Sequence, residues 1–110
     1  MLARGNRVIV PDDFRTVVRR GRRTSTPTAV YHRYARDAEA PLRFGFIISR
    51  AVGPAVARNR LRRRWRALGR QAVDSGLRGA DVVVRALPGC AERDWDSLRA
   101  EFADVIGGVR

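Results

Sequence analysis

The sequence predicts an α+β fold whose elements run in the order helix, strand, strand, helix, strand, helix. Three segments repeat apolar residues at helical spacing, three others carry the alternating or β-branched pattern of strands, and glycine or proline separates most of them. The 110 residues suffice for one small domain with a modest core. No internal repeat or low-complexity segment divides the chain, so we expect residues 1–110 to form a single domain.

The first expected helix begins at Pro11-Asp12-Asp13, with an aspartate as N-cap and an acidic first turn, and ends at Gly21. Between these limits Phe14, Val17 and Val18 share one side at the spacing i, i+3, i+4. Arginines occupy the rest of the surface, which predicts a short amphipathic helix with a basic side.

Two strands are expected next. Residues 22–27 form a polar connector to the segment 28–34, in which Thr28, Val30, His32 and Tyr34 point the same way. After a turn at 35–41, the segment 42–49 has the stronger pattern, with Leu42, Phe44, Phe46 and Ile48 on one face and Gly45 on the other. We expect these two strands to pair as a hairpin.

A long helix is expected from about Ala55, after the break at Gly53-Pro54. Its apolar residues form one narrow stripe and its arginines fill the remaining arc. The stripe comprises Ala57, Leu61, Trp65, Leu68 and Ala72, and the arc comprises Arg60, Arg62, Arg63, Arg64, Arg66 and Arg70. This helix therefore packs on the core with one side and offers arginine with the other.

The last two elements are a buried strand at 80–87 and a helix at about 93–106. In the helix, Trp95, Leu98, Phe102, Val105 and Ile106 have helical spacing. A strand, the arginine-rich helix and another strand form a β-α-β unit, which predicts parallel pairing around a crossover.

The charge of the chain indicates a polyanionic partner. Its 23 basic residues are all arginine, and with 11 acidic residues they give a net charge of +12. Arginine holds phosphate bidentately and stacks on bases, so nucleic acid is favoured over an anionic membrane or an acidic protein. Cys90 is the sole cysteine, and neither a signal peptide nor a spanning apolar run is recognisable, so we expect a cytoplasmic protein.

Catalysis by the protein itself is not expected. His32 stands alone on a strand, and Cys90 has no basic partner that the sequence can place beside it. The acidic pairs Asp12-Asp13 and Asp94/Asp96 are better explained by helix N-termini than by acid-base chemistry, and no phosphate-binding loop, dinucleotide or metal-binding motif is present. The sequence therefore predicts no catalytic residue and no metal-binding residue in this chain.

The arginine-rich helix lacks compensating charge. From Arg58 to Val73 there is no acidic residue, and the first is Asp74. Like charges at i, i+3 and i+4 destabilise a free helix by a few tenths of a kcal/mol per pair. An anionic partner is therefore expected on this helix.

The segment "RFGFIISRAVGPAVARNRLRRRWRAL", residues 43–68, resembles the central signature of the bacterial ribonuclease P protein subunit: a strand ending in Ser-basic, a glycine turn, then Arg-Asn-Arg and further basic residues on a helix. Asp13-Phe14 with the following basic residues resembles the family's first helix, and "GADVVVRALP" (79–88) its last strand. The order of elements agrees over nearly the whole chain.

The resemblance implies a two-layer α/β sandwich with a left-handed β-α-β crossover, an exception to the usual right hand. It also implies that a large RNA subunit with its Mg²⁺ ions carries out catalysis, and that the protein helps it remove the 5′ leader from precursor tRNA. No obligatory protein partner is implied, and a general RNA-binding or ribosome-associated protein remains the alternative function.

The resemblance further assigns two sets of RNA contacts. Those expected against the catalytic RNA are Arg58, Asn59, Arg60, Arg62, Arg63 and Arg66, and those expected around the single-stranded leader are Phe14, Val18, His32, Ser49 and Arg50. The family often has an aromatic residue where Val18 stands, another near His32, and a polar or basic residue where Pro54 stands. Base stacking by this chain is therefore expected to be weaker than usual for the family.

Overall fold

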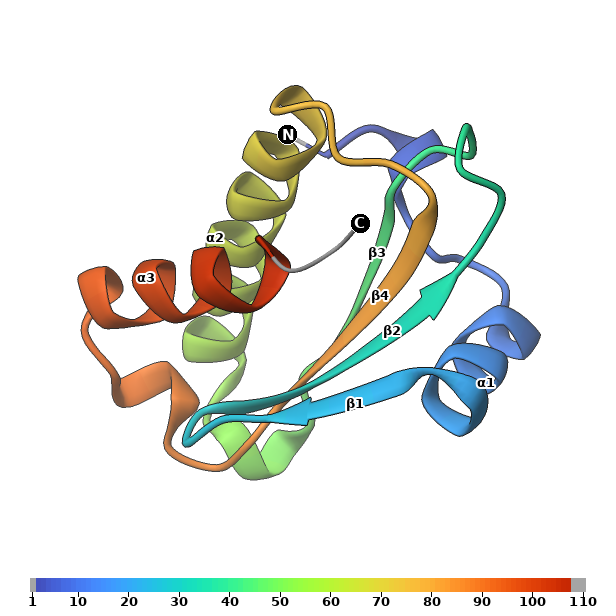
Figure 1. Cartoon of the computed structure of the whole chain (residues 1–110). Helices are drawn as coiled ribbons and strands as arrows, with labels where there is room; N and C mark the ends of the chain where they lie inside the picture. Colours follow the sequence, from blue (N-terminus) through green and yellow to red (C-terminus); the bar gives the residue numbers. More distant parts are fainter. Residues whose placement is uncertain (1, 108–110) are drawn as a thin grey trace.

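The computed structural model describes residues 2–107, and Figure 1 shows the arrangement of its elements. The helices and strands are α1 (Pro11–Arg20), β1 (Arg22–Ser25), β2 (Ala29–Ala35), β3 (Arg43–Ile47), α2 (Ala55–Asp74), β4 (Ala80–Ala86) and α3 (Trp95–Ile106). Short 3-10 turns lie at Arg4–Asn6, Arg50–Val52 and Cys90–Glu92. The α+β class and the order of the predicted elements are confirmed, with β1 as an additional strand.

The four strands form one sheet in the order β1-β2-β4-β3. The parallel pairing of β3 with β4, which α2 connects, confirms the predicted crossover. The predicted hairpin is wrong, because β4 lies between β2 and β3 and pairs with both. Val82, Val83 and Val84 are fully buried, so β4 is stabilised at the centre, where both of its faces are covered.

The hairpin partner of β2 is β1, in the segment expected to be a polar connector. Apart from the half-buried Thr24, the β1 residues are exposed, so no apolar alternation marks the strand. An edge strand needs only backbone hydrogen bonds from its one neighbour and can consist of polar residues. This explains why the pattern of side chains did not reveal it.

Helices cover the two faces of the sheet unequally. On one face α2 and α3 bury the main core, in which Tyr31, Phe44 and Trp65 are the largest fully buried side chains (Figure 1). On the opposite face lies α1, whose Val17 is 0% exposed. Phe14 of α1 packs directly on Gly45 of β3, since a Cβ added to Gly45 would lie 2.4 Å from the Phe14 ring.

The ends of the helices follow local chemistry. The N-cap of α1 is Val10 and not the expected aspartate, because Pro11 occupies the first helical position and Asp12 and Asp13 fall in the first turn. Gly21 ends α1 as predicted. Asp94 caps α3, and its carboxylate accepts hydrogen bonds from the backbone N–H of Ser97 at 3.1 Å and from the Ser97 hydroxyl at 2.8 Å.

The segment before α1 lies along the free edge of β3. The backbone N–H of Val8 donates to the carbonyl of Phe44 at 2.8 Å, and the Asn6 side-chain amide donates to the carbonyl of Leu42 at 2.8 Å. Leu2 and Val8 are buried. This segment therefore shields the sheet edge and brings its arginines next to α2.

Candidate nucleic-acid interface

The arginine-rich side of α2 forms the first candidate surface. Leu61, Trp65 and Leu68 of the predicted stripe are buried, which commits that side of the helix to the core. Asn59, Arg60 and Arg63 are exposed on the other side, while Arg58, Arg62 and Arg66 are half-buried. All six residues expected against the RNA subunit thus lie off the apolar stripe, on one helix.

Several α2 arginines are positioned by neighbouring groups other than acids. Arg58 Nε donates to the carbonyl of Gly53 at 3.0 Å, and Arg62 Nη1 donates to Asn59 Oδ1 at 3.0 Å. The Arg64 guanidinium lies 5.2 Å from the ring centroid of Trp95, a cation–π contact. Within residues 2–107, the ion pair formed by α2 is the one between Arg70 and Asp74, at its C-terminal end. The N-terminal two-thirds of the helix therefore presents positive charge without acidic neutralisation.

The second candidate surface is the sheet face beside α1. Phe14 and Val18 lie one helical turn apart, Phe14 half-buried on Gly45 and Val18 exposed. His32 lies in register with Val83, which pairs with Gly45, so it belongs to the same face. The structure thus brings Phe14 and His32 to one region of the sheet.

Ser49 and Arg50 are exposed just beyond the carboxyl end of β3. Ile47, the last residue of β3, pairs with Arg85 of β4, so Ser49 and Arg50 follow the strand end at which Arg85 lies. These leader-binding candidates therefore lie at one end of the sheet face, whereas Phe14 lies nearer its middle.

Arg85 was missed by sequence reasoning. It is the one exposed residue of β4 and pairs with Val30 on one side and Ile47 on the other. The single arginine inside an apolar strand was the available signal, but the segment 80–87 was interpreted as buried. This exposed arginine presents a guanidinium group near the end of the sheet face at which Ser49 and Arg50 lie.

His32 is 6% exposed, and its Nδ1 atom is buried without a hydrogen-bond partner. Burial lowers the pKa of His32 below its ordinary value, and the positive charges of Arg23 and Arg85 lower it further. The imidazole is therefore neutral near pH 7. One expectation for this strand is wrong: Thr28 does not share the side of His32, because it precedes β2 and its hydroxyl donates to Glu101 of α3 at 2.7 Å.

Reactive side chains are not gathered at either surface. Cys90 lies in a 3-10 turn and is fully buried, and burial followed by the charge of Glu101 raises the pKa of its thiol to about 11. In the described part of the chain, no three His, Cys, Asp or Glu side chains lie close enough together to hold a metal ion. The arrangement is suited to binding a polyanion along α2 and the sheet face.

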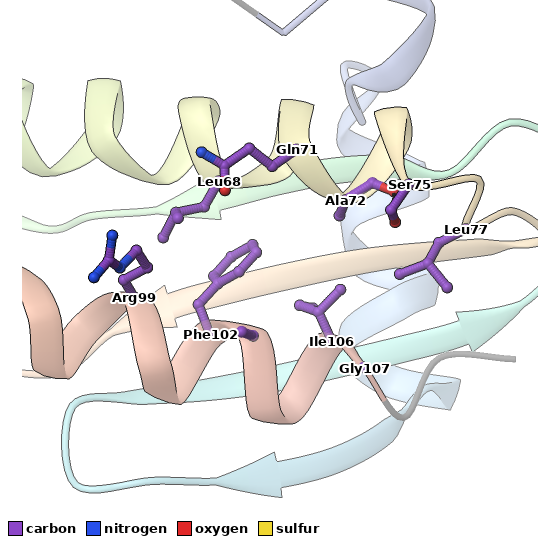
Figure 2. A pocket seen from close by; sticks show the side chains of 10 residues that line it. Leu68, Gln71, Ala72, Ser75, Leu77, Arg99, Phe102, Ile106 and Gly107 are labelled. Atoms are coloured by element: carbon purple, nitrogen blue, oxygen red, sulfur yellow. Dashed lines mark hydrogen bonds between the residues drawn. The ribbon is translucent and has the colours of Figure 1, made fainter.

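An apolar cavity of about 240 Å³ lies between α2 and α3, away from both surfaces. Figure 2 shows Phe102 and Ile106 of α3 beneath Leu68 and Ala72 of α2, with Arg99 at one end. None of the predicted site residues lines it. Among residues 2–107, no helix has the length and apolar character needed to cross a membrane.

Comparison with known families adds an independent result. A sequence model of the family described as Ribonuclease P matches residues 2–109. A protein of Clavibacter michiganensis named ribonuclease P protein component is 49% identical over 106 residues, covering 96% of this chain and 94% of the relative. A protein of the same name from Streptomyces avermitilis is 46% identical over 120 residues, covering 98% of each chain.

Solved structures share the fold at lower identity. The RNase P protein of Thermotoga maritima, in complex with 1-(4-fluorophenyl)-2-thiourea, superposes with a TM-score of 0.83 at 21% identity, covering 94% of this chain and 100% of the other. The RNase P protein of Staphylococcus aureus gives a TM-score of 0.81 at 21% identity, covering 94% and 96%. These solved structures share the mixed α+β fold of this chain.

Proposed function

The chain belongs to the ribonuclease P protein family, and from this premise we propose that it is the protein subunit of a ribonucleoprotein that removes the 5′ leader from precursor tRNA. Family membership implies a role in an endoribonuclease complex that processes tRNA. The finer assignment is that a catalytic RNA cleaves the phosphodiester bond while this chain binds that RNA and the leader. The chain acts in the cytoplasm, as one RNA-binding domain spanning residues 1–110.

The observation that carries the proposal is the arginine surface of α2 without acidic neighbours, on a helix whose other side is buried. An exposed helix face usually mixes charges of both signs, since repulsion among arginines destabilises it. RNA phosphates would remove this repulsion and release counterions, which favours binding. The contacts proposed for the RNA subunit are Arg58, Asn59, Arg60, Arg62, Arg63 and Arg66.

The leader is proposed to cross the sheet face beside α1. Phe14 offers a half-exposed ring for a base, and Arg85 and Arg50 offer guanidinium groups for phosphates. Val18, His32 and Ser49 complete the set. His32 is neutral and largely covered, so its contribution is the shape and polarity of the surface rather than charge.

Magnesium ions are proposed to act on the RNA subunit, where they would supply the electrophilic catalysis of phosphodiester hydrolysis. The chain's own part is to hold the RNA subunit and the leader in place. The buried carboxylate of Asp81 is occupied within the fold, because it accepts two hydrogen bonds from Arg43, at 2.8 and 2.6 Å.

The test is cleavage of precursor tRNA by a bacterial ribonuclease P RNA at low Mg²⁺ concentration, with and without this chain. We expect the protein to stimulate cleavage, because added positive charge offsets phosphate repulsion that Mg²⁺ otherwise screens. No stimulation at any protein concentration would contradict the proposal. The alternative, a ribosome-associated RNA-binding protein, predicts co-purification with ribosomal RNA instead of one large non-ribosomal RNA.

A further inference from the structure

A cavity of about 310 Å³ lies at the free edge of β3, where residues of the N-terminal segment, β3 and α2 line it together with Phe14 of α1. Arginines from two distant parts of the chain line it, Arg4 and Arg7 from the N-terminal segment and Arg62 and Arg66 from α2. None of its lining residues is acidic. We name these four side chains the arginine pocket.

The backbone explains why Arg7, Arg62 and Arg66 line the same cavity. Arg7 forms a parallel bridge with Phe44, and residues paired across neighbouring strands point to the same face, so Arg7 points toward α2. Its Nε donates to the carbonyl of Leu2 at 2.9 Å, which holds the side chain in place. Arg62 and Arg66 lie one helical turn apart on α2 and therefore face the same way.

Electrostatics indicates that three of these groups, Arg7, Arg62 and Arg66, interact. Burial lowers the pKa of Arg66, and the positive charges of Arg7 and Arg62 lower it further. Among the described residues, none of the four arginines forms an ion pair. Within residues 2–107 the protein thus holds these like charges together without an acidic partner.

Another half-buried arginine of the same protein shows the contrast. Arg43 donates two hydrogen bonds to Asp81 and lies 3.5 Å from Asp13. The partly buried guanidinium of Arg43 is therefore neutralised from within the fold, whereas those of the arginine pocket are not. Because no acidic residue in the described part of the chain lines the arginine pocket, an anionic ligand is favoured there.

We propose that the arginine pocket binds one phosphate group, and that in the assembled particle this group is a backbone phosphate of the RNA subunit. Guanidinium forks bind phosphate oxygens bidentately, and convergent forks suit a single tetrahedral anion. Phe46 and Ile9 add apolar lining beside the arginines. The sugar or base attached to that phosphate would pack against this apolar surface. The N-terminal segment thereby joins α2 in the RNA interface, and Arg4 and Arg7 become contacts that the family motif on α2 does not contain.

Phosphate binding by the arginine pocket is tested on the isolated protein with inorganic phosphate as the probe. Phosphate is titrated at low ionic strength while the arginine Nε–H signals are followed by NMR. We expect the signals of Arg7 and Arg66 to shift together, and we expect the substitutions Arg7→Gln and Arg66→Gln each to weaken phosphate binding about 10-fold or more, as for removal of a charge-assisted hydrogen bond. Arg93→Gln, which removes an exposed arginine outside the pocket, should leave the affinity unchanged.

The assignment of the phosphate to the backbone of the RNA subunit rests on the proposed function and is tested with that RNA. Because Arg7 and Arg66 would hold the same phosphate, the double variant should weaken binding much less than the sum of the two single effects. The slope of log K against log salt should fall by the amount expected for one phosphate, roughly 0.7 to 0.9, rather than for two. Arg93→Gln again serves as the control, and circular dichroism establishes that each variant is folded.

The outcomes distinguish phosphate binding by the pocket from the assignment of that phosphate to the RNA backbone. If inorganic phosphate does not shift the Arg7 and Arg66 signals, or binds Arg7→Gln and Arg66→Gln as well as the unmodified protein, the pocket assignment is overturned. If phosphate binds there but RNA affinity is the same in both variants, the ligand is a free anion and the assignment to the RNA backbone is overturned. If the chain does not bind the RNA subunit at all, the proposed function fails, while the phosphate titration still decides the pocket.

Discussion

His32 illustrates how a single buried side chain makes stability depend on pH. In the unfolded chain it takes up a proton near pH 6.5, whereas burial, Arg23 and Arg85 keep it neutral to lower pH in the folded protein. The unfolded state therefore binds more protons near and below pH 6.5, so the free energy of unfolding contributed by this group falls as the pH is lowered through about 6.5.

The first prediction compares thermal unfolding of the unmodified protein and His32→Gln across that pH range. The unmodified protein should lose more stability on acidification than the variant, which has no titrating group at this position. Parallel melting curves at every pH would show that the protonation of His32 does not differ between the two states.

Arg85 carries the second prediction. Replacing it by glutamine keeps a polar side chain on the exposed position of β4 but removes the charge. We expect the reconstituted holoenzyme to bind precursor tRNA about 10-fold more weakly, the effect of one charged hydrogen bond, and to bind mature tRNA as before because that product lacks a leader. An equal decrease for both RNAs would place Arg85 outside the leader path.

Phe14 packs on Gly45 with one side of its ring. In our proposal the other side contacts a leader base. The third prediction is that Phe14→Leu weakens precursor binding by ~1 to 3 kcal/mol, the range for base–aromatic contacts, with little change in melting temperature. The control is Val17→Ala in the same helix, which removes fully buried volume and should lower stability without selectivity for the precursor. If Phe14→Leu behaves like Val17→Ala, the ring is purely a packing group.

Among the elements of the fold, α2 separates packing from binding most clearly. Arg60 and Arg63 are exposed and lie off the stripe formed by Leu61, Trp65 and Leu68. Substituting both by alanine removes like-charge repulsion and introduces a better helix former, so the folded state should be at least as stable.

The fourth prediction is that Arg60→Ala/Arg63→Ala binds the RNA subunit more weakly and with a smaller salt dependence, by about 0.7 to 0.9 in slope for each phosphate that is no longer bound. Fluorescence or filter-binding titrations at several salt concentrations measure this directly. Leu61→Ala is the contrasting variant, since deleting a buried leucine costs about 2 to 5 kcal/mol of stability. Unchanged RNA affinity in the double variant would show that Arg60 and Arg63 of α2 do not contribute to binding of the RNA subunit.

The molecule as a whole is built to place two basic surfaces around one small core. The crossover from β3 through α2 to β4 sets the arginine helix on one face of the sheet, and α1 lies on the other (Figure 1). Asp81, Arg43 and Asp13 link β4, β3 and the first turn of α1 by ion pairs. These ion pairs fix the first turn of α1 to the sheet.

The fifth prediction concerns this entire assembly. The isolated protein should not cleave precursor tRNA, because Cys90 is inaccessible, His32 is buried and neutral, and neither has a catalytic partner in the part of the chain that the structure describes. The assay uses protein treated exhaustively with nuclease, with added Mg²⁺. Leader removal that survives this treatment would show that the protein itself carries the catalytic centre.

Local pattern alone was sufficient to predict the three helices, the strands β2, β3 and β4, the buried stripe of α2 and its outward arginines. These features follow from the 3.6-residue and two-residue periods of helix and strand, which any isolated segment already displays. The resemblance in residues 43–68 likewise lay in one continuous stretch. For the same reason the polar edge strand β1 escaped notice, since its side chains have no apolar period to detect.

Only the tertiary structure decided which strands pair, because partner choice depends on the burial of both faces of a strand and not on neighbourhood in sequence. The triple valine of β4 is stable between β2 and β3, which excluded the hairpin that adjacency suggested. That insertion exposes Arg85 on the sheet face, and the edge of β3 that remains free receives the N-terminal segment. Arg4 and Arg7 thus reach Arg62 and Arg66 across more than fifty residues of chain, a convergence of like charges that exists only after the sheet is assembled.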